Sequence, residues 1–182
     1  DTDFSARVCP GLTLGDLDAA AIEEFRRLWI RKSGNTALAA LNPAQLLVDA
    51  EATVDDGITY AALILFGTHA ALGRYLAQSE VVFEYRANEA PGPAQQRKEY
   101  RQGFFAWYDD LWETINLRNE MQHYQDGLFM YDIATVDERS AREAILNATA
   151  HRDYQLGGSV FVRQFPRRIE IDSPGGCLGH HA

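Results

Sequence analysis

The chain has 182 residues, of which 46% are hydrophobic, so it can bury a core and its composition argues against a disordered protein. The formal net charge of −9 argues against nucleic-acid binding by the chain as a whole. The longest apolar run, residues 60–66, is far shorter than the ~20 residues that a membrane helix needs, so we expect no membrane contact.

The two cysteines, Cys9 and Cys177, lie at opposite ends of the chain and suggest neither a metal site nor a disulfide framework. This usage favours a reducing compartment, and we expect a cytoplasmic protein. The sequence shows no signal peptide and does not begin with Met. Its first and last residues resemble the interior of a longer chain, so we expect a piece of a larger protein.

Three helices are predicted in the first part of the chain. Asp18 is a suitable N-cap for a helix whose apolar face ends near Gly34. Asn42 followed by proline predicts a second, short helix that ends near Val48. The run at residues 59–66 is compatible with a buried helix or a buried strand, and a threonine cap, two alanines and a following glycine favour the helix.

Apolar and polar residues alternate over residues 80–87, which predicts a strand. The stretch at 87–97 contains two prolines and a glycine within a few positions and predicts a linker. We therefore expect a mainly helical connecting region at residues 1–90 and a second region at residues 98–182.

An aromatic and aliphatic stripe predicts a long helix over residues 100–115. Its members follow helical spacing: Tyr100, Phe104, Tyr108, Leu111, Trp112 and Ile115. Acidic rather than basic residues accompany the stripe, which argues against a platform for stacking nucleic-acid bases. The stripe predicts either core packing or a contact between two copies of the chain in a homo-oligomer.

The last part of the chain carries a helix, expected from about Val136 to His151, followed by two strands and a Pro-Gly-Gly turn. Three polar residues of this helix, Glu143, Asn147 and His151, are spaced four apart and therefore share one side. Spacing alone fits solvated surface residues equally well.

The order of these parts carries more information than the spacing. The segment "EAILNATAHRDY", the strand hairpin and "IEIDSPGG" together resemble the ATP-binding family related to the RecG helicase, a divergent branch of the ATPase superfamily of gyrase, histidine kinases and MutL. The resemblance is closest from Glu138 to Gly176 and extends more weakly over most of the chain. It implies a cytoplasmic, bacterial transcriptional regulator that binds DNA through domains outside this chain.

The resemblance also implies roles for individual residues. Glu143 would orient the attacking water and act as the base, and Asn147 would be the ligand of the magnesium that bridges the phosphates of ATP. A carboxylate and an amide oxygen suit these tasks. The remaining residues implied at the cofactor site are His151, Asp153, Asp172, Gly175 and Gly176. A bracing role between helix and hairpin also suits His151, Arg152 and Asp153, with Tyr154 packed beside them.

The sequence departs from the superfamily at the adenine-contact motif, where an aspartate precedes the glycines. Ser173 occupies the position of that aspartate, and Asp172 comes one residue early. The segment that covers the phosphates in the superfamily is also missing from these 182 residues. We therefore expect the chain by itself to bind ATP weakly or not at all, and any ATPase activity to be weak and to belong to the longer protein.

The predicted fold class is α+β: a helical first half with short strands, then a truncated ATPase-like α/β sandwich with an antiparallel hairpin. The predicted function is part of an ATP-binding transcriptional regulator. The alternative is a degenerate module that has lost ATP and serves dimerisation or scaffolding. The P-loop motifs of a helicase motor are absent from the sequence, so the RecG relationship does not imply helicase activity.

Overall fold

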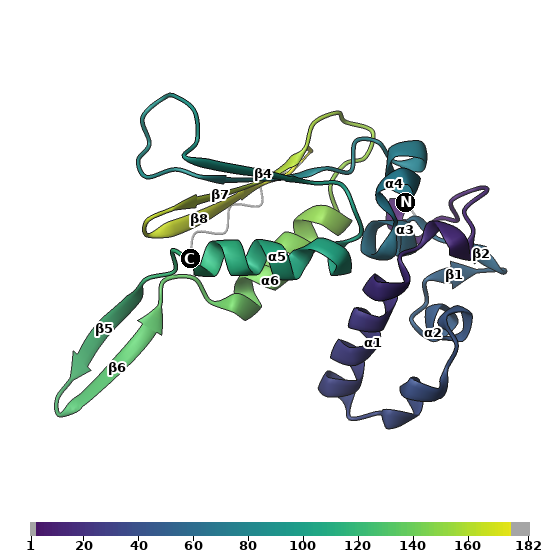
Figure 1. Cartoon of the computed structure of the whole chain (residues 1–182), viewed down its shortest axis with the longest axis horizontal. Coiled ribbons are helices and arrows are strands. Elements are labelled where there is room, and N and C mark those ends of the chain that lie inside the picture. The colour runs from purple at the N-terminus through teal and green to yellow at the C-terminus, as the bar shows by residue number, and fades with distance from the viewer. Residues whose placement is uncertain (1–2, 176–182) are drawn as a thin grey trace. The chain divides into compact units, whose positions relative to one another are not determined.

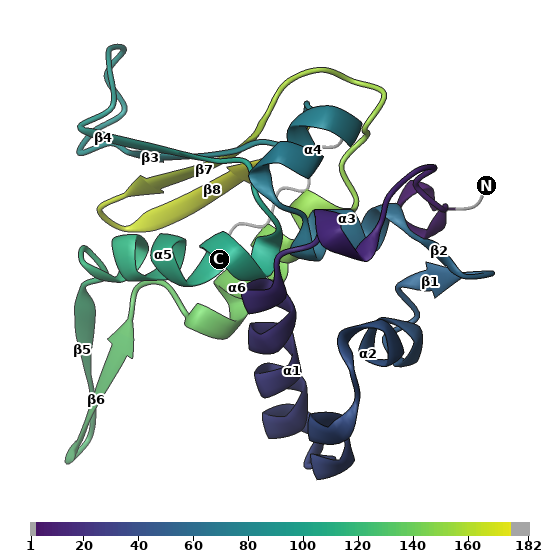
Figure 2. The ribbon, with the colours of Figure 1, turned by 45° about the vertical axis from the view of Figure 1, so that its right-hand side comes forward.

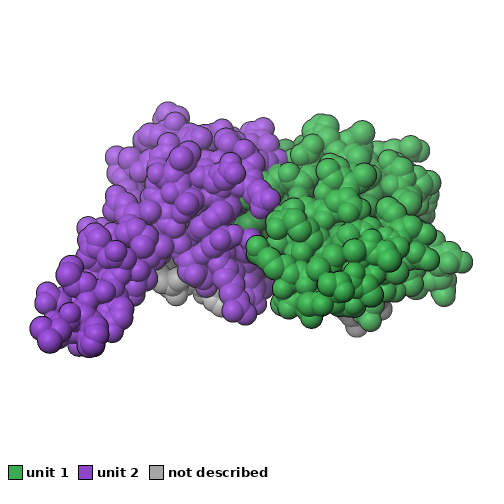
Figure 3. Space-filling view, turned by 60° about the horizontal axis from the view of Figure 1, so that its bottom comes forward, with its two compact units in different colours: residues 1–80, 101–108 green, residues 81–100, 109–182 purple. Residues whose placement is uncertain are grey.

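The structure is a computed structural model that describes residues 3–175, and it has the mixed α+β fold expected from the sequence. The chain forms two compact units (Figure 3). Unit 1 comprises residues 1–80 and 101–108, and unit 2 comprises residues 81–100 and 109–182. The expected boundary at 87–97 therefore differs from the observed one, because this segment connects two paired strands inside unit 2.

Unit 1 is mainly helical. Its α-helices are α1 (Ala19–Ser33), α2 (Pro43–Asp49), α3 (Tyr60–Phe66) and α4 (His69–Tyr75). Three 3-10 turns, Phe4–Ala6, Leu14–Asp16 and Thr36–Ala40, and two short antiparallel strands, β1 (Thr53–Val54) and β2 (Gly57–Ile58), complete it.

Local capping explains where these helices begin. The Asp18 carboxylate accepts hydrogen bonds from the backbone N–H groups of Ala20 and Ala21, so α1 begins at the predicted position. Asn42 caps α2, with proline as the first helical residue. The Thr59 hydroxyl caps α3, so the ambiguous run is a helix as favoured. Helix α4, which Thr68 caps in the same way, was not expected from the sequence.

Aromatic rings form part of the core of unit 1. Phe25 of α1 lies against Phe66 and Phe105, with ring centroids 5.3 and 5.4 Å away. The rings of Phe66 and Phe105 stack on each other at 5.8 Å. Phe105 comes from the 101–108 segment, so this return of the chain contributes directly to the core of unit 1.

Unit 2 is built on a four-stranded sheet in the order β4-β3-β7-β8. The strands are β3 (Val81–Tyr85), β4 (Gln96–Tyr100), β7 (Val160–Phe165) and β8 (Arg168–Asp172). The central pair β3 and β7 is parallel, and the two outer pairs are antiparallel. Helices α5 (Phe104–Asn116) and α6 (Glu138–Ala150) lie on the same face of this sheet (Figure 1).

Helix α5 begins at Phe104 rather than near Tyr100, because Tyr100 is the last residue of β4. Strand β4 was not expected from the sequence, because its residues are polar at most positions. The aromatic stripe of α5 is core: Phe104, Tyr108, Leu111 and Ile115 are each at most 4% exposed. These four members of the stripe therefore fit the core-packing alternative, whereas Trp112 is only partly buried.

A second two-stranded sheet, made of β5 (Met121–Asp126) and β6 (Phe129–Ala134), was also missed. Its two-residue loop is Gly127–Leu128, and Gly127 has a φ of 61°. Glycine at the first position of a two-residue hairpin loop suits a type II′ turn, which requires a positive φ there.

In the part of the chain that the structure describes, no helix has both the length and the apolar character needed to cross a bilayer.

Candidate functional site

Helix α6 carries the candidate residues, and its start is well defined. The Asp137 carboxylate accepts hydrogen bonds from the backbone N–H and the hydroxyl of Ser140, at 2.9 and 2.8 Å. These bonds hold the pKa of Asp137 below its usual range. Ala141, Ile145 and Ala148 are buried, Ala144 is partly exposed, and α6 packs against β7 and β8.

The opposite side of α6 is a stripe that faces solvent. Glu143 and Asn147 are exposed, as is His151, the residue that follows the last turn. Within residues 3–175, neither Glu143 nor Asn147 forms a side-chain hydrogen bond or ion pair. The helix thus presents a carboxylate and an amide on one side, and neither group bonds to another described residue.

Two buried side chains hold the loop that follows α6. Arg152 is only 4% exposed, its Nη2 donates to the carbonyl of Leu156 at 3.1 Å, and its guanidinium lies 5.0 Å from the centre of the Tyr154 ring. Burial lowers the pKa of Arg152. The Tyr154 hydroxyl donates to the carbonyl of Thr149 on α6. Arg152 and Tyr154 therefore tie the loop to the end of the helix.

The turn after β8 lies directly against this loop. The backbone N–H of Asp153 donates to the carbonyl of Pro174 at 3.0 Å. Gly175 has a φ of 92°, and a Cβ added to it would come within 2.5 Å of the Cβ of Asp153. Gly175 thus satisfies two conditions that disfavour a side chain: a left-handed backbone and a close neighbour. Tertiary contacts bring together two expected site residues, Asp153 and Gly175, that are 22 positions apart in sequence. Gly176 lies outside the described residues.

Asp172 does not join this group. It pairs with Phe161 in the register of β7 and β8, and its carboxylate is bonded to Arg163. The neighbouring residue Gln164 points the other way, since its Nε2 donates to the carbonyl of Ile115 on α5. Because side chains alternate along a strand, Arg163 and Asp172 lie on the face of the sheet opposite α5 and α6. The implied adenine contact by Asp172 is therefore not supported by its position.

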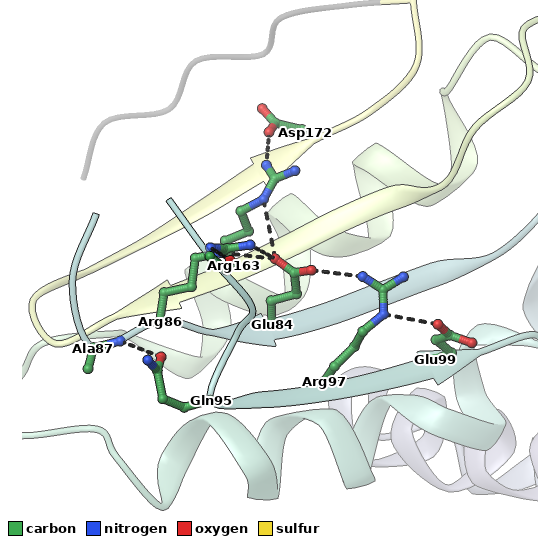
Figure 4. Close-up of polar contacts among 9 residues, drawn as sticks. Glu84, Arg86, Ala87, Gln95, Arg97, Glu99, Arg163 and Asp172 are labelled. Carbon is green, nitrogen blue, oxygen red and sulfur yellow. Dashed lines mark hydrogen bonds and ion pairs between the residues drawn. The ribbon is translucent and has the colours of Figure 1, made fainter. Parts of the chain in front are cut away.

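The cluster around Asp172 is centred on Glu84 of β3 (Figure 4). Glu84 is 6% exposed and contacts Arg86 and Arg97 at 3.0 and 2.8 Å, with Arg163 at 3.8 Å. Arg97 is also bonded to Glu99. The positive charges are balanced by carboxylates at close range, so this face is a structural ion-pair network rather than an anion-binding site.

A surface hollow of about 420 Å³ lies elsewhere in unit 2, beside β4 and α5. It is lined by Lys98, Asp110, Glu113, Thr114, Asn116 and Leu117. The Lys98 ammonium donates to the Asp110 carboxylate and the Thr114 hydroxyl, at 3.0 and 2.9 Å. Its charge is thus already compensated, and none of the residues expected from the sequence lines this hollow.

The described residues contain no group of three or more His, Cys, Asp or Glu side chains placed to hold a metal ion. The resemblance implies Asn147 as the magnesium ligand. Magnesium in nucleotide sites is commonly held by one or two protein groups together with phosphate oxygens and water.

Comparison with known proteins gives the fold but no activity. Residues 1–82 match a family model described as a domain of unknown function (DUF8451). The match covers fewer than half of the 182 residues of this chain. None of the curated proteins matches the chain. The crystal structure of the DIP2311 protein from Corynebacterium diphtheriae is similar, with a TM-score of 0.68 and 23% identity over 97% of this chain. The match spans 34% of that protein, so the chain corresponds to about a third of its length. At this identity the likeness establishes a shared fold.

Proposed function

We propose that unit 2 is an ATPase-like nucleotide-binding module and that the chain is part of an ATP-binding transcriptional regulator. The observation that carries this proposal is the contact between Asp153 and the Pro174–Gly175 turn. Through this contact, a glycine-containing turn lies next to the end of the helix that presents Glu143 and Asn147 to solvent. This is the order of parts on which the sequence resemblance rests.

The residue chemistry fits the implied cofactor. Asn147 offers a hard amide oxygen for magnesium, and Glu143 offers a carboxylate that accepts a proton from water. Bound magnesium would neutralise charge on the phosphates. Both side chains are exposed on α6 and are not engaged by other described residues, so a ligand would displace no existing bond of theirs.

In this proposal, Ser173 contacts the adenine base. Asp172 is bonded to Arg163 on the opposite face of the sheet, whereas Ser173 directly precedes the turn that contacts Asp153. A serine hydroxyl both donates and accepts hydrogen bonds, so it can still contact a base edge, although without the charge of an aspartate.

The regulator role places DNA recognition in domains beyond this chain, in the bacterial cytoplasm. The net charge of −9 supports this division, because the chain itself lacks the excess of Lys and Arg that contacts to phosphate require.

A degenerate scaffold is the second candidate function, and two observations favour it. Ser173 replaces the aspartate of the adenine motif, and Asp172 is held by Arg163 away from α6. In that case Glu143 and Asn147 are surface residues, and unit 2 contributes only its shape and its contacts with partners.

Calorimetric titration of Mg-ATP separates the two candidates. The protein to use is the full-length protein in which this chain occurs, compared with its Asn147→Ala and Asn88→Ala variants. Asn88 is an exposed asparagine in the loop between β3 and β4, so it controls for the same chemical change away from the site. We expect saturable binding that Asn147→Ala weakens at least tenfold and Asn88→Ala leaves unchanged.

Absence of Mg-ATP binding by the unmodified protein would reject the nucleotide module and leave the scaffold. Binding that is insensitive to Asn147→Ala would reject the assignment of α6 as the magnesium helix. Titration of the 182-residue chain alone should give weaker binding than the full-length protein, because the segment expected to cover the phosphates is missing from it.

A further inference from the structure

Arg152 is a buried cation in the loop that joins α6 to β7, a loop that can be followed through the yellow-green part of the ribbon (Figure 2). The residue is 4% exposed. Burial of a charge is costly, and an uncharged side chain of similar length, such as methionine, would fill the same space without that cost. Core packing alone therefore does not account for an arginine at this position.

The guanidinium closes a short turn over residues 152–156. Its Nη2 donates to the carbonyl of Leu156 at 3.1 Å, and the N–H of Leu156 donates to the carbonyl of Asp153 at 3.2 Å. The Asp153 carboxylate accepts a further bond, from the N–H of Gln155 at 2.9 Å. The Leu156 residue is 47% exposed, so polar contacts rather than apolar burial hold this end of the turn.

The same guanidinium lies against a ring that is fixed to α6. It is 5.0 Å from the centre of the Tyr154 ring, and the Tyr154 hydroxyl donates to the carbonyl of Thr149. The Thr149 hydroxyl in turn donates to the carbonyl of Ile145 at 2.8 Å within the helix. A planar guanidinium can stack on a ring and donate to a carbonyl at the same time, for which a lysine ammonium is less suited. Arg152 thus joins the turn to the last part of α6.

The opposite side of the turn contacts the segment that follows β8. The N–H of Asp153 donates to the carbonyl of Pro174 at 3.0 Å, and a Cβ added to Gly175 would lie 2.5 Å from the Asp153 Cβ. Gly158 of the same loop is also near, since a Cβ added to it would lie 3.6 Å from the Pro174 Cγ. Asp153 is therefore held between α6 and the turn after β8.

We propose that Arg152 is a positioning residue of the nucleotide site, an inference that rests on the function proposed above. Its guanidinium fixes the separation between Asn147 on α6 and Ser173, which directly precedes the Pro174–Gly175 turn. One nucleotide can contact both residues only if that separation is held, and a displacement of about 1 Å is enough to lose much of the benefit of preorganised groups. Arg152 itself is shielded from solvent and acts through the position of Asp153.

Two substitutions separate positioning from general stabilisation. Arg152→Met removes the charge and the donors but keeps a side chain of similar length. Arg26→Met is the matched control, because Arg26 is 9% exposed and donates to the carbonyls of Leu38 and Leu41, at 2.5 and 2.7 Å, in unit 1. Thermal unfolding verifies that each variant folds. Arg152→Lys keeps the charge and one donor but not the planar group, and it carries the same test with changes of about threefold if Arg152→Met does not fold.

The first readout does not depend on a nucleotide. Amide hydrogen exchange of the 182-residue chain reports on the N–H of Asp153, and we expect it to be at least ~10-fold faster in Arg152→Met, because the turn loses its bond to Leu156. The N–H of Gly103, which donates to the carbonyl of Gly67 at 2.8 Å in unit 1, should exchange at an unchanged rate. The control substitution should leave the exchange of Asp153 unchanged.

The second readout is calorimetric titration of Mg-ATP into the full-length protein. Arg152→Met should raise the Kd at least ~10-fold, whereas Arg26→Met should leave it within about threefold of the unmodified value. Unchanged exchange of Asp153 in Arg152→Met overturns the inference, as does faster exchange with an unchanged Kd, and in both cases the nucleotide site stands if the unmodified protein binds Mg-ATP. Equal weakening by the two substitutions also overturns it, because it shows a general loss of stability. Absence of binding by the unmodified protein rejects the proposed function and, with it, the role of Arg152.

Discussion

At the scale of single residues, Glu84 shows how a charge can be buried in this fold. Its carboxylate lies on the central strand β3 and contacts Arg97 of β4, Arg163 of β7 and Arg86, the residue that follows β3. Arg163 in turn is bonded to Asp172 on β8, so the network joins all four strands of the sheet. Burial of a carboxylate is costly unless charges and hydrogen bonds compensate it, and here several guanidinium groups do so.

We expect Glu84→Gln to lower the free energy of unfolding by about 2–3 kcal/mol, because it leaves the arginines without their shared counter-charge. The value is at the low end for a broken buried pair, since these arginines are 25–48% exposed in their side chains. Urea unfolding at neutral pH measures the change. Glu99→Gln is the matched control: Glu99 also contacts Arg97, but its side chain is 56% exposed, so the loss should stay below about 1 kcal/mol. Equal losses in the two variants would show that the burial of Glu84 is not what matters.

At the scale of elements, one carboxylate accepts two of the hydrogen bonds that attach β4 to α5. Asp110 of α5 accepts hydrogen bonds from the Tyr100 hydroxyl at 2.6 Å and from the Lys98 ammonium at 3.0 Å. These bonds hold the pKa of Asp110 below its usual range, while burial raises the pKa of Tyr100. A β-strand of mostly polar residues is thus fixed to the helix through polar side chains on its inner face.

This lowered pKa predicts a pH-dependent contribution to stability. A carboxylate whose pKa is lower in the folded state than in the unfolded state stabilises the fold above about pH 4, and the contribution is lost as the pH falls through the folded-state pKa. Asp110→Asn should therefore reduce the free energy of unfolding at pH 7, by up to about 1 kcal/mol, since this carboxylate is 55% exposed. The difference from the unmodified chain should shrink in acid.

Urea unfolding between pH 7 and pH 3 measures that difference. Asp109→Asn is the control, because Asp109 is an exposed neighbour on the same helix that takes no part in these bonds. If the penalty for Asp110→Asn stays constant with pH, the ionised carboxylate is not the source of the stabilisation.

Helix α6 shows how far sequence patterns determine a candidate site. The small apolar face and the four-residue spacing correctly predicted a helix with Glu143 and Asn147 on one side, and the structure shows both residues exposed. The sequence did not reveal that Gly175 packs on Asp153 or that Asp172 faces away from α6. Both facts depend on strand register and loop packing between distant segments, which local patterns do not encode.

At the scale of the whole molecule, the two units are interleaved along the chain. Unit 1 is interrupted after residue 80 and completed by residues 101–108, which return from β4. The family model ends at residue 82 and therefore omits this return. The omitted segment carries Phe104 and Phe105, and Phe105 contacts Phe25 and Phe66.

We accordingly expect residues 1–82 alone not to fold cooperatively. Loss of one buried Phe side chain typically costs about 3–5 kcal/mol, a large part of the stability of a small domain. Amide dispersion in a heteronuclear NMR spectrum, compared with that of the 182-residue chain, measures the outcome. Well-dispersed amides and a sharp thermal transition for residues 1–82 would show that unit 1 does not need the 101–108 segment.

The sequence by itself determined the elements whose signals are local. Caps at Asp18, Asn42 and Thr59 predicted helix starts, and alternation predicted β3, because capping and side-chain alternation act within a few residues. Only the tertiary structure decided the rest: the polar strand β4, the return of the chain into unit 1, the side to which Asp172 points and the exposure of the hairpin of β5 and β6. Each depends on which distant segments meet, and that choice is made by burial and strand pairing across the whole chain rather than by any local pattern.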